Sequence, residues 1–289
     1  MRYGYYACSN NDIVVYSSAL REFMWWLRRL EGVFPDGFIA APILVNGYDG
    51  GLDFGGYYID PWGGAWPLRL VVRSAGKLVR FMARVPLPVS YADGAFIVFH
   101  HRLARRGLFD PRYFLYSEDV EASLRAWSLG APSFLVPVVL GRHYRSSSAG
   151  RAKPLQIYMQ VRNRVYTVYR YLGIRGLVAV LAWYASYPFR LIDARDPAVR
   201  SLLEEVGLSV VASPERHGGR VLMARLVTRS VVDAVRWARR DKAEKEATQH
   251  IPLIDMPFGS VASMKAVLRT VQHRLRDILV QHMRRRGSS

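Results

Sequence analysis

The stretch Gly107-Leu-Phe-Asp-Pro-Arg-Tyr-Phe-Leu-Tyr-Ser-Glu-Asp-Val-Glu121 is the most informative part of this chain. It sets three carboxylates at the start of a predicted helix, directly after an aromatic-rich loop. A carboxylate at the mouth of a site can take a proton from an incoming hydroxyl group. The stretch also fits a plain helix start, because Ser117 is a good N-cap residue and acidic side chains complement the helix dipole. Taken alone, it favours the plain helix start.

The segments around this stretch alternate between helix and strand patterns. Apolar residues at helical spacing predict helices over residues 19–30 and 118–129. Short apolar runs predict strands over residues 38–44, 94–100 and 133–138. Glycines, aspartates and aromatic residues predict a long loop over residues 46–66, followed by a basic amphipathic stretch over 69–84. The segments therefore mix helices and strands.

Six segments carry a more specific pattern, in the order Ser9-Asn-Asn-Asp12, Asp93-Gly-Ala-Phe96, Gly107-Leu-Phe-Asp110 with Tyr116–Glu121, Val136-Pro137, His143–Ser148 and Arg162-Asn163. Together they resemble the second half of the catalytic domain of family 2 glycosyltransferases, and the rhamnosyltransferase-like branch is closest. The resemblance covers residues 9–173. It implies the α/β fold class, with an incomplete Rossmann-like, A-type glycosyltransferase domain followed by a basic α-helical tail. The implied reaction is inverting transfer of a sugar from a nucleotide-sugar donor to a hydroxyl acceptor, in the synthesis of a surface glycan or glycolipid.

The resemblance assigns the chemistry to a few residues. Asp119, with Glu118 beside it, would act as the general base for the acceptor hydroxyl. Asp12 would bind a divalent cation, Mg²⁺ or Mn²⁺, that bridges the donor diphosphate. His143 would complete that metal site or contact the phosphates. Such a cation would neutralise charge on the departing nucleotide. Without the resemblance, His143 between two arginines is typical of a solvated basic turn.

Further positions are implied on both sides of the reaction. On the acceptor side they are Asp93, Gly94, Trp62 and Trp66, although aromatic side chains more often serve packing. On the donor and phosphate side they are Asn10, Asn11 and Arg162. Arginines and tyrosines alternate over residues 155–172, as on a nucleic-acid surface. No recognised nucleic-acid motif accompanies them, so we expect no specific nucleic-acid partner.

The family's domain opens with strands that hold the nucleotide, and they precede the strand that carries Asp12. The chain starts at the equivalent of that later strand. We therefore expect the N-terminal, nucleotide-binding part to be missing from this chain, or to be supplied by a partner chain.

Charge divides the chain more sharply than hydrophobicity does. Residues 1–150 carry a net charge of +4 and residues 151–289 carry +14. We expect a partial catalytic domain over residues 1–150, a helical segment over 151–195 and a basic helical region over 196–289. The single cysteine, Cys8, excludes an internal disulfide framework. The N-terminus lacks the pattern of a signal peptide, which favours the cytoplasm.

An uncharged run of 13 residues covers 177–189, between Arg175 and Arg190. It is shorter than the roughly 20 residues that a membrane-spanning helix needs. It fits a helix lying in the interface of an anionic membrane, which would place the protein on the inner face of the cell membrane. It equally fits a helix buried against the catalytic domain. The alternative to an enzyme is therefore a non-catalytic remnant that binds a membrane or a partner through its basic tail.

Overall fold

The computed structural model describes residues 4–60, 63–70, 72, 74–82, 85–144, 154–185 and 217–240. Among these residues the chain forms two compact units. The first contains residues 4–110 and 119–144, and the second contains residues 111–118, 154–185 and 217–240. The first unit carries the sheet, and the second is mainly helical.

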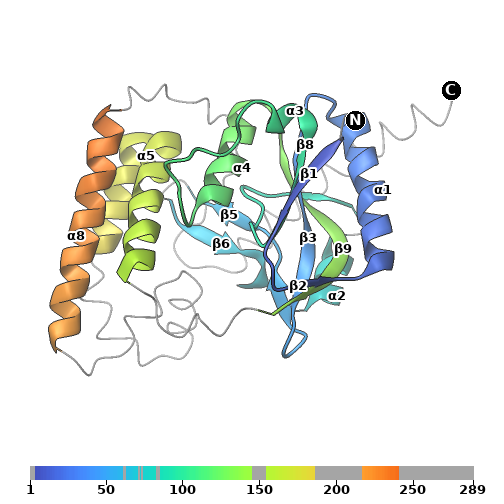
Figure 1. The fold of residues 1–289 in the computed structure, drawn as a ribbon, viewed down its shortest axis with the longest axis horizontal. Coiled ribbons are helices and arrows are strands. Elements are labelled where there is room, and N and C mark those ends of the chain that lie inside the picture. Colours follow the sequence, from blue (N-terminus) through green and yellow to red (C-terminus); the bar gives the residue numbers. More distant parts are fainter. Residues whose placement is uncertain are drawn as a thin grey trace. The chain divides into compact units, whose positions relative to one another are not determined.

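The first unit is built on a mixed sheet (Figure 1). Its strands are β1 (Tyr5–Ser9), β2 (Ile13–Val15), β3 (Ile39–Asn46), β4 (Leu52–Phe54), β7 (Leu87–Pro88), β8 (Phe96–His100) and β9 (Ser133–His143). In the described residues their order is β1-β8-β3-β9-β2, with β4 on β3 and β7 on β9. β3 and β9 run parallel, whereas β1, β2 and β8 pair antiparallel with their neighbours. The predicted α/β class is confirmed.

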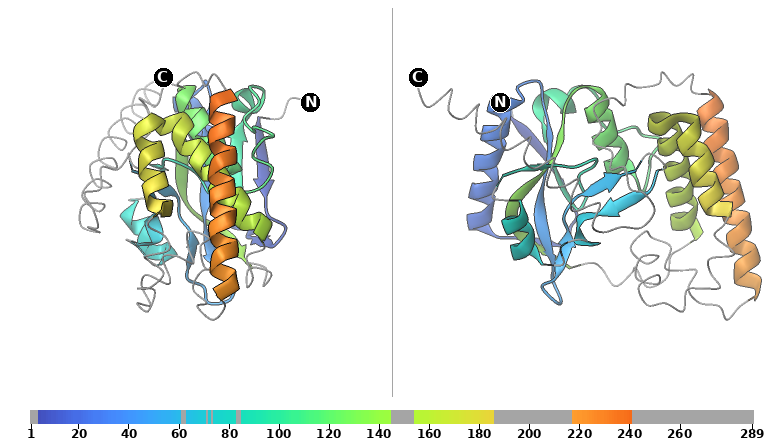
Figure 2. Two further views of the ribbon diagram at one scale, coloured as in Figure 1. Left: turned by 90° about the vertical axis from the view of Figure 1, so that its left-hand side faces the viewer. Right: turned by 180° about the vertical axis from the view of Figure 1, so that it is seen from behind.

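Helices cover both faces of this sheet, as Figure 2 shows from behind. Helix α1 (Ser17–Val33) packs on one face through Phe23, Leu27 and Leu30, each 1% exposed. On β3, Ala40 and Leu44 join that cluster. The alternate residues of β3 point to the other face, where α3 (His101–Ala104) and α4 (Glu118–Ser128) pack. The two-residue period of a strand thus supplies a core on each side.

Most elements predicted in this unit are confirmed. The helix predicted over 19–30 lies within α1, and that over 118–129 corresponds to α4. The three predicted strands correspond to β3, β8 and β9. Strand β9 continues to His143, five residues beyond the predicted end. This extension brings His143 into the sheet.

The long loop predicted over residues 46–66 is wrong. The segment contains β4 and a hairpin of β5 (Tyr57–Ile59) and β6 (Ala65–Pro67). Asp60 holds the hairpin turn, because its carboxylate accepts hydrogen bonds from the Gly64 N–H at 2.7 Å and the Trp66 Nε1–H at 2.8 Å. The stretch over 69–84 forms the short helices η1 (Leu68–Leu70) and α2 (Ala75–Phe81). Strands of three residues are too short to show an alternating pattern.

The second unit contains α5 (Pro154–Ala185) and α8 (His217–Arg240), which pack against each other. Helix α5 is broken at Gly173, where φ is 68° and ψ is −159°. Of the apolar run over 177–189, the part up to residue 185 belongs to the second arm of α5. Of the basic helical region predicted over 196–289, residues 217–240 form α8, and the other residues lie outside the part of the chain that the structure describes.

By length and composition, one described helical segment, Tyr158–Tyr184, is apolar enough to cross a membrane, with a mean hydropathy of 1.2. Gly173 interrupts it, so the segment is two shorter arms. Leu177, Val180 and Tyr184 of the second arm are buried in the core shared with α8. The length criterion alone is therefore weak support for a membrane span.

Candidate metal and catalytic site

His143 lies between two carboxylates in the first unit. Its Nε2 is 3.0 Å from Oδ1 of Asp12, and its Nδ1 is 2.6 Å from Oδ2 of Asp53. The side chains of His143 and Asp53 are 5% and 2% exposed, whereas that of Asp12 is 24% exposed. The three residues therefore form a line from the protein interior to the surface. Asp12 and His143, predicted as metal ligands, are brought together.

The backbone holds this line in place. Asp12 lies in the turn between β1 and β2. The next residue, Ile13 on β2, pairs with His143 on β9. The Tyr144 N–H donates to the Asp12 carbonyl at 2.8 Å. A Cβ on Gly141 would come within 2.2 Å of the Val14 carbonyl oxygen. Glycine at 141 thus permits the close pairing of β2 and β9 that sets Asp12 beside His143.

Hydrogen-bond chemistry fixes the role of each ring nitrogen. A carboxylate can only accept, so Nδ1 of His143 carries a hydrogen and donates it to Asp53. Nε2 and Oδ1 of Asp12 would then both be acceptors. A proton or a cation must lie between them, because two facing lone pairs repel each other.

The pair fits a divalent cation. Neighbouring ligands of an octahedral ion with bonds of about 2.1 Å lie about 3 Å apart. The 3.0 Å between Nε2 and Oδ1 agrees with that spacing. One imidazole nitrogen and one carboxylate oxygen favour Mn²⁺ over Mg²⁺, which prefers oxygen ligands alone. Asp53 would be the outer partner that fixes the orientation of His143.

Asp119 is held against the backbone of a neighbouring turn. Its Oδ2 accepts from the Gly94 N–H at 2.8 Å, and its Oδ1 accepts from the Val120 N–H at 2.8 Å. A Cβ on Gly94 would lie 3.0 Å from the Asp119 Cβ, so glycine permits this approach. Burial raises the pKa of the Asp119 carboxyl, against the backbone hydrogen bonds that lower it. A raised pKa makes a carboxylate a stronger base.

The turn at Asp93 connects the two parts of the site. Asp93 caps this turn, since its Oδ1 accepts from the Ala95 N–H at 2.8 Å. The Ala95 carbonyl accepts from the Asn10 N–H at 2.9 Å. The turn therefore contacts the segment before Asp12 on one side and Asp119 on the other. Asp93 and Gly94, predicted on the acceptor side, lie at the centre of the site, and the exposed Asn10 and Asn11 lie at its rim.

The start of α4 differs from the simple capped helix start that the sequence predicts. Tyr116 and Ser117 have φ of 65° and 63°, in the left-handed region. An N-cap residue normally has an extended backbone, so the predicted N-cap role of Ser117 does not fit. Two successive left-handed residues are a strained conformation that commonly occurs near functional sites. Glu118, at the first position of α4, is partly buried.

The remaining predicted positions lie elsewhere. Trp66 donates to Asp60 and packs on a hydrophobic cluster, which favours packing over sugar binding. Trp62 lies outside the described residues. Arg162, in the second unit, is 7% exposed. Its Nη2 donates to the Arg112 carbonyl and its Nε to Asn163 Oδ1, so donor binding by Arg162 stays a prediction that these contacts do not favour.

Asp53 is the residue that sequence reasoning missed. It lies between Leu52 and Phe54 on β4, in a segment interpreted as a loop. The available signal was the alternation of apolar, acidic and apolar residues over 52–54, which is short for a strand. No protein-family model matches the chain, and no curated protein resembles it at a significant level. The functional assignment therefore depends on the residues and the geometry of the site.

Proposed function

We propose that the chain is a glycosyltransferase module that catalyses inverting transfer of a sugar from a nucleotide-sugar donor to a hydroxyl acceptor. The observation that carries this proposal is the 3.0 Å contact between Asp12 and His143. The two residues are far apart in sequence, and the resemblance to family 2 glycosyltransferases assigned both to one metal. The turn at Asp93 also links the segment before Asp12 to Asp119, the third residue that the resemblance implies.

Asp119 is the general base in this proposal. Its raised pKa suits proton removal from an acceptor hydroxyl, and the Gly94 and Val120 N–H groups fix its orientation. The Asp93 turn holds that carboxylate beside the Asn10–Asp12 segment. The acceptor would be a glycan or a lipid-linked glycan. Glu118, its neighbour, is a second candidate for contact with the acceptor.

Asp12 and His143 would hold the divalent cation. When bound, the cation supplies Lewis-acid stabilisation of the diphosphate leaving group. Asp53 orients the His143 ring and keeps its Nδ1 protonated, so that Nε2 points to the site. The mixed sheet is compatible with an incomplete A-type glycosyltransferase domain, and we propose that the first unit has this fold.

Binding of nucleoside diphosphates tests this proposal on the intact chain. Calorimetry with uridine, guanosine and thymidine diphosphates, with and without Mn²⁺, should show micromolar binding of at least one of them only when Mn²⁺ is present. Asp12→Asn should abolish that binding, whereas Asp119→Asn should leave it intact. Binding that is indifferent to Mn²⁺ and to Asp12→Asn would contradict the proposed donor site.

Transfer activity tests the base. With the nucleotide sugar identified by binding, Asp119→Asn should lower transfer to a glycan or lipid-linked acceptor by about a hundredfold to ten-thousandfold, the range that general base catalysis contributes. Glu118→Gln is the matched control, because it changes the adjacent carboxylate. Equal losses for both variants would remove the specific role of Asp119.

A second candidate function is binding to an anionic membrane surface on the cytoplasmic side. The observation that favours it is on the second arm of α5, where Ile174 and Val178 are 65% and 60% exposed, one turn apart and beside Arg175. An exposed apolar pair with a basic neighbour suits a helix in the membrane interface. Flotation with phosphatidylserine vesicles at low salt should carry the chain, and Ile174→Asp with Val178→Asp should reduce it at least tenfold. No flotation at low salt would exclude this function.

A further inference from the structure

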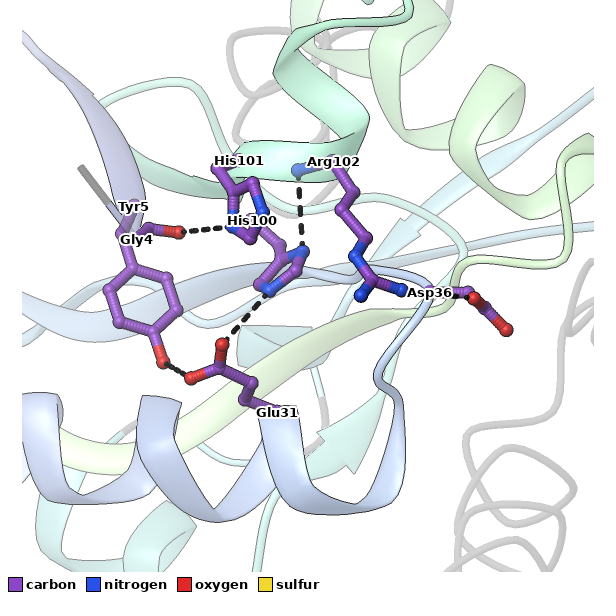
Figure 3. Close-up of polar contacts among 7 residues, drawn as sticks. All are labelled: Gly4, Tyr5, Glu31, Asp36, His100, His101 and Arg102. Carbon is purple, nitrogen blue, oxygen red and sulfur yellow. Dashed lines mark hydrogen bonds and ion pairs between the residues drawn. The ribbon is translucent and has the colours of Figure 1, made fainter. Parts of the chain in front are cut away.

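A second group of metal-ligand residues lies in the first unit, at the opposite end of β1 from the Asn10–Asp12 turn. Glu31 comes from the last turn of α1, His100 from the end of β8 and His101 from the start of α3. One ligand atom from each lies within 4.8 Å of the others. Figure 3 shows the two rings and the carboxylate gathered beside the first residues of β1. Neither the proposed catalysis nor the resemblance uses these residues.

The distances place the carboxylate within reach of the buried ring. Oε1 of Glu31 lies 3.3 Å from Nε2 of His100. A tetrahedral zinc ion with bonds of about 2.0–2.1 Å has ligands about 3.3 Å apart. His101, whose ring centroid is 4.4 Å from that of His100, is partly exposed, which leaves space for a water ligand.

Outer contacts already orient two of the three groups. The Tyr5 hydroxyl donates to Oε2 of Glu31 at 2.5 Å, which leaves Oε1 directed to His100. Nδ1 of His101 lies 3.3 Å from the Gly4 carbonyl oxygen, and only a protonated nitrogen can make that contact. Nε2 of His101 then carries the lone pair. A backbone carbonyl behind one ring nitrogen is the usual partner of a metal-binding histidine.

We propose that Glu31, His100 and His101 form a binding site for a divalent transition metal, with zinc as the best-suited ion. Two imidazoles and one carboxylate, with one position open to water, are a known zinc donor set. Figure 3 also shows Arg102, whose guanidinium is paired with Asp36 at 3.4 Å.

His100 must change its tautomer to bind. Its Nδ1 now accepts a weak hydrogen bond from the Arg102 N–H at 3.4 Å, so the ring hydrogen is on Nε2. In the metal-bound state Nε2 coordinates the ion and the same hydrogen is on Nδ1, with no net release of protons. The Nδ1–H would then face the Arg102 N–H, so metal binding would break the contact by which His100 caps α3. That contact is near the upper distance limit of a hydrogen bond, so its own loss costs little.

The site would fasten the edge of the sheet. Metal bonds would link α1 to the junction of β8 and α3, and the contacts to Gly4 and Tyr5 would hold the start of β1 against them. β1 leads directly to the Asn10–Asp12 turn. A metal here would therefore stabilise the strand that carries one side of the candidate catalytic site.

Cobalt and zinc binding tests this inference on the intact chain in an Asp12→Asn background, which removes the other metal site. One equivalent of Co²⁺ should give visible absorption bands of a four-coordinate ion, and Zn²⁺ should displace it. Saturating zinc should raise the melting temperature by roughly 5–10 °C. His101→Ala and Glu31→Gln should each lower the affinity at least about tenfold.

The choice of variants separates lost ligands from lost fold. His101 and Glu31 are partly exposed, so their variants should keep the circular dichroism spectrum of the parent. Arg102→Ala is the matched control on the same turn and should bind cobalt as the parent does. Cobalt binding that survives both His101→Ala and Glu31→Gln would overturn the proposal. An absence of any four-coordinate spectrum in the parent would overturn it as well.

Discussion

The two units use their buried polar side chains in different ways. In the first unit, Asp53, His143 and Asp12 form a line that reaches the surface, and its outer atoms face each other across 3.0 Å. In the second unit, Asn163 is fully buried and donates through Nδ2 to the carbonyls of Leu115 and Tyr116, at 2.9 and 2.7 Å. We propose that the first arrangement binds a ligand, whereas the second holds the backbone through hydrogen bonds.

We interpret the Asp12, His143 and Asp53 group as a ligand site and the Asn163 contacts as a structural support. A buried amide that satisfies two carbonyls holds a loop in one conformation, and here the loop includes the left-handed Tyr116. Arg162 belongs to the same support, since its guanidinium lies 4.2 Å from the ring of Trp237. A histidine with a carboxylate on each side needs a proton or a cation between the outer pair. The following variants test this division.

The largest effect is expected for His143→Ala. Loss of the imidazole removes one of two protein ligands, so Mn²⁺ affinity should fall by more than about a hundredfold. Titration of free Mn²⁺ by electron paramagnetic resonance measures this directly. His101→Ala is the matched control: it removes a ligand of the second proposed metal site and should leave the Mn²⁺ affinity of the Asp12–His143 site unchanged. A similar loss in both variants would show that the histidines contribute only through folding.

Asp53→Asn should have the next largest effect on metal binding. Its amide can donate to Nδ1 of His143 and move the ring hydrogen to Nε2, where it would oppose the metal. We expect a loss of Mn²⁺ affinity of about 10- to 100-fold, with little change in secondary structure. Asp49→Asn is the control, because Asp49 caps an exposed turn through the Gly51 N–H. Unchanged affinity in Asp53→Asn would remove its positioning role.

Asn163→Ala should have the opposite effect to the two variants above: it should destabilise the fold and spare the metal site. The carbonyls of Leu115 and Tyr116 would lose the hydrogen bonds from the buried Asn163 amide, so we expect a loss of about 1–3 kcal/mol of stability in denaturant unfolding. Mn²⁺ affinity should not change. Gln160→Ala, on the same helix, is the control: its Oε1 has no hydrogen bond among the described residues, and the loss should be smaller. If Asn163→Ala weakened metal binding as strongly as it weakened the fold, the division between site and support would be wrong.

The smallest effect is a shift in the pH profile of transfer in Gly94→Ala. The Gly94 N–H stabilises the Asp119 carboxylate and so lowers its pKa. Displacing Asp119 weakens this bond, raises the pKa and leaves less carboxylate at a given pH. The acid limb should move to higher pH by about half a unit to one unit. Gly76→Ala should not move it, because a Cβ there meets nothing within 4 Å.

The sequence predicted the parts of the fold that have long apolar patterns. Helix α1 and strands β3, β8 and β9 are such elements, and all were expected near their observed positions. The β5–β6 hairpin was missed because its strands are three residues long and its turn is held by one side chain, Asp60. The local pattern of apolar and polar residues does not show a hydrogen bond from one side chain that holds a turn.

The site was predictable only in part. The resemblance pointed to Asp12, His143 and Asp119, and it contained no indication of Asp53. A single aspartate in a glycine-rich segment looks like a turn residue until β4 pairs with β3. The role of Arg162 depends on Trp237, which belongs to another helix, so its burial was not readable from neighbouring residues. The roles of Asp53 and Arg162 both depend on tertiary packing.

The most direct measurement is pulsed electron paramagnetic resonance of Mn²⁺ bound to the intact chain, read for coupling to a nitrogen nucleus. The measurement is made in a His101→Ala background, which removes a ligand of the second proposed metal site. Coordination by the imidazole of His143 predicts a ¹⁴N coupling in that variant, and the coupling should disappear when His143→Ala is added. Bound Mn²⁺ without ¹⁴N coupling, or a coupling that persists in the double variant, would contradict a metal site at Asp12 and His143.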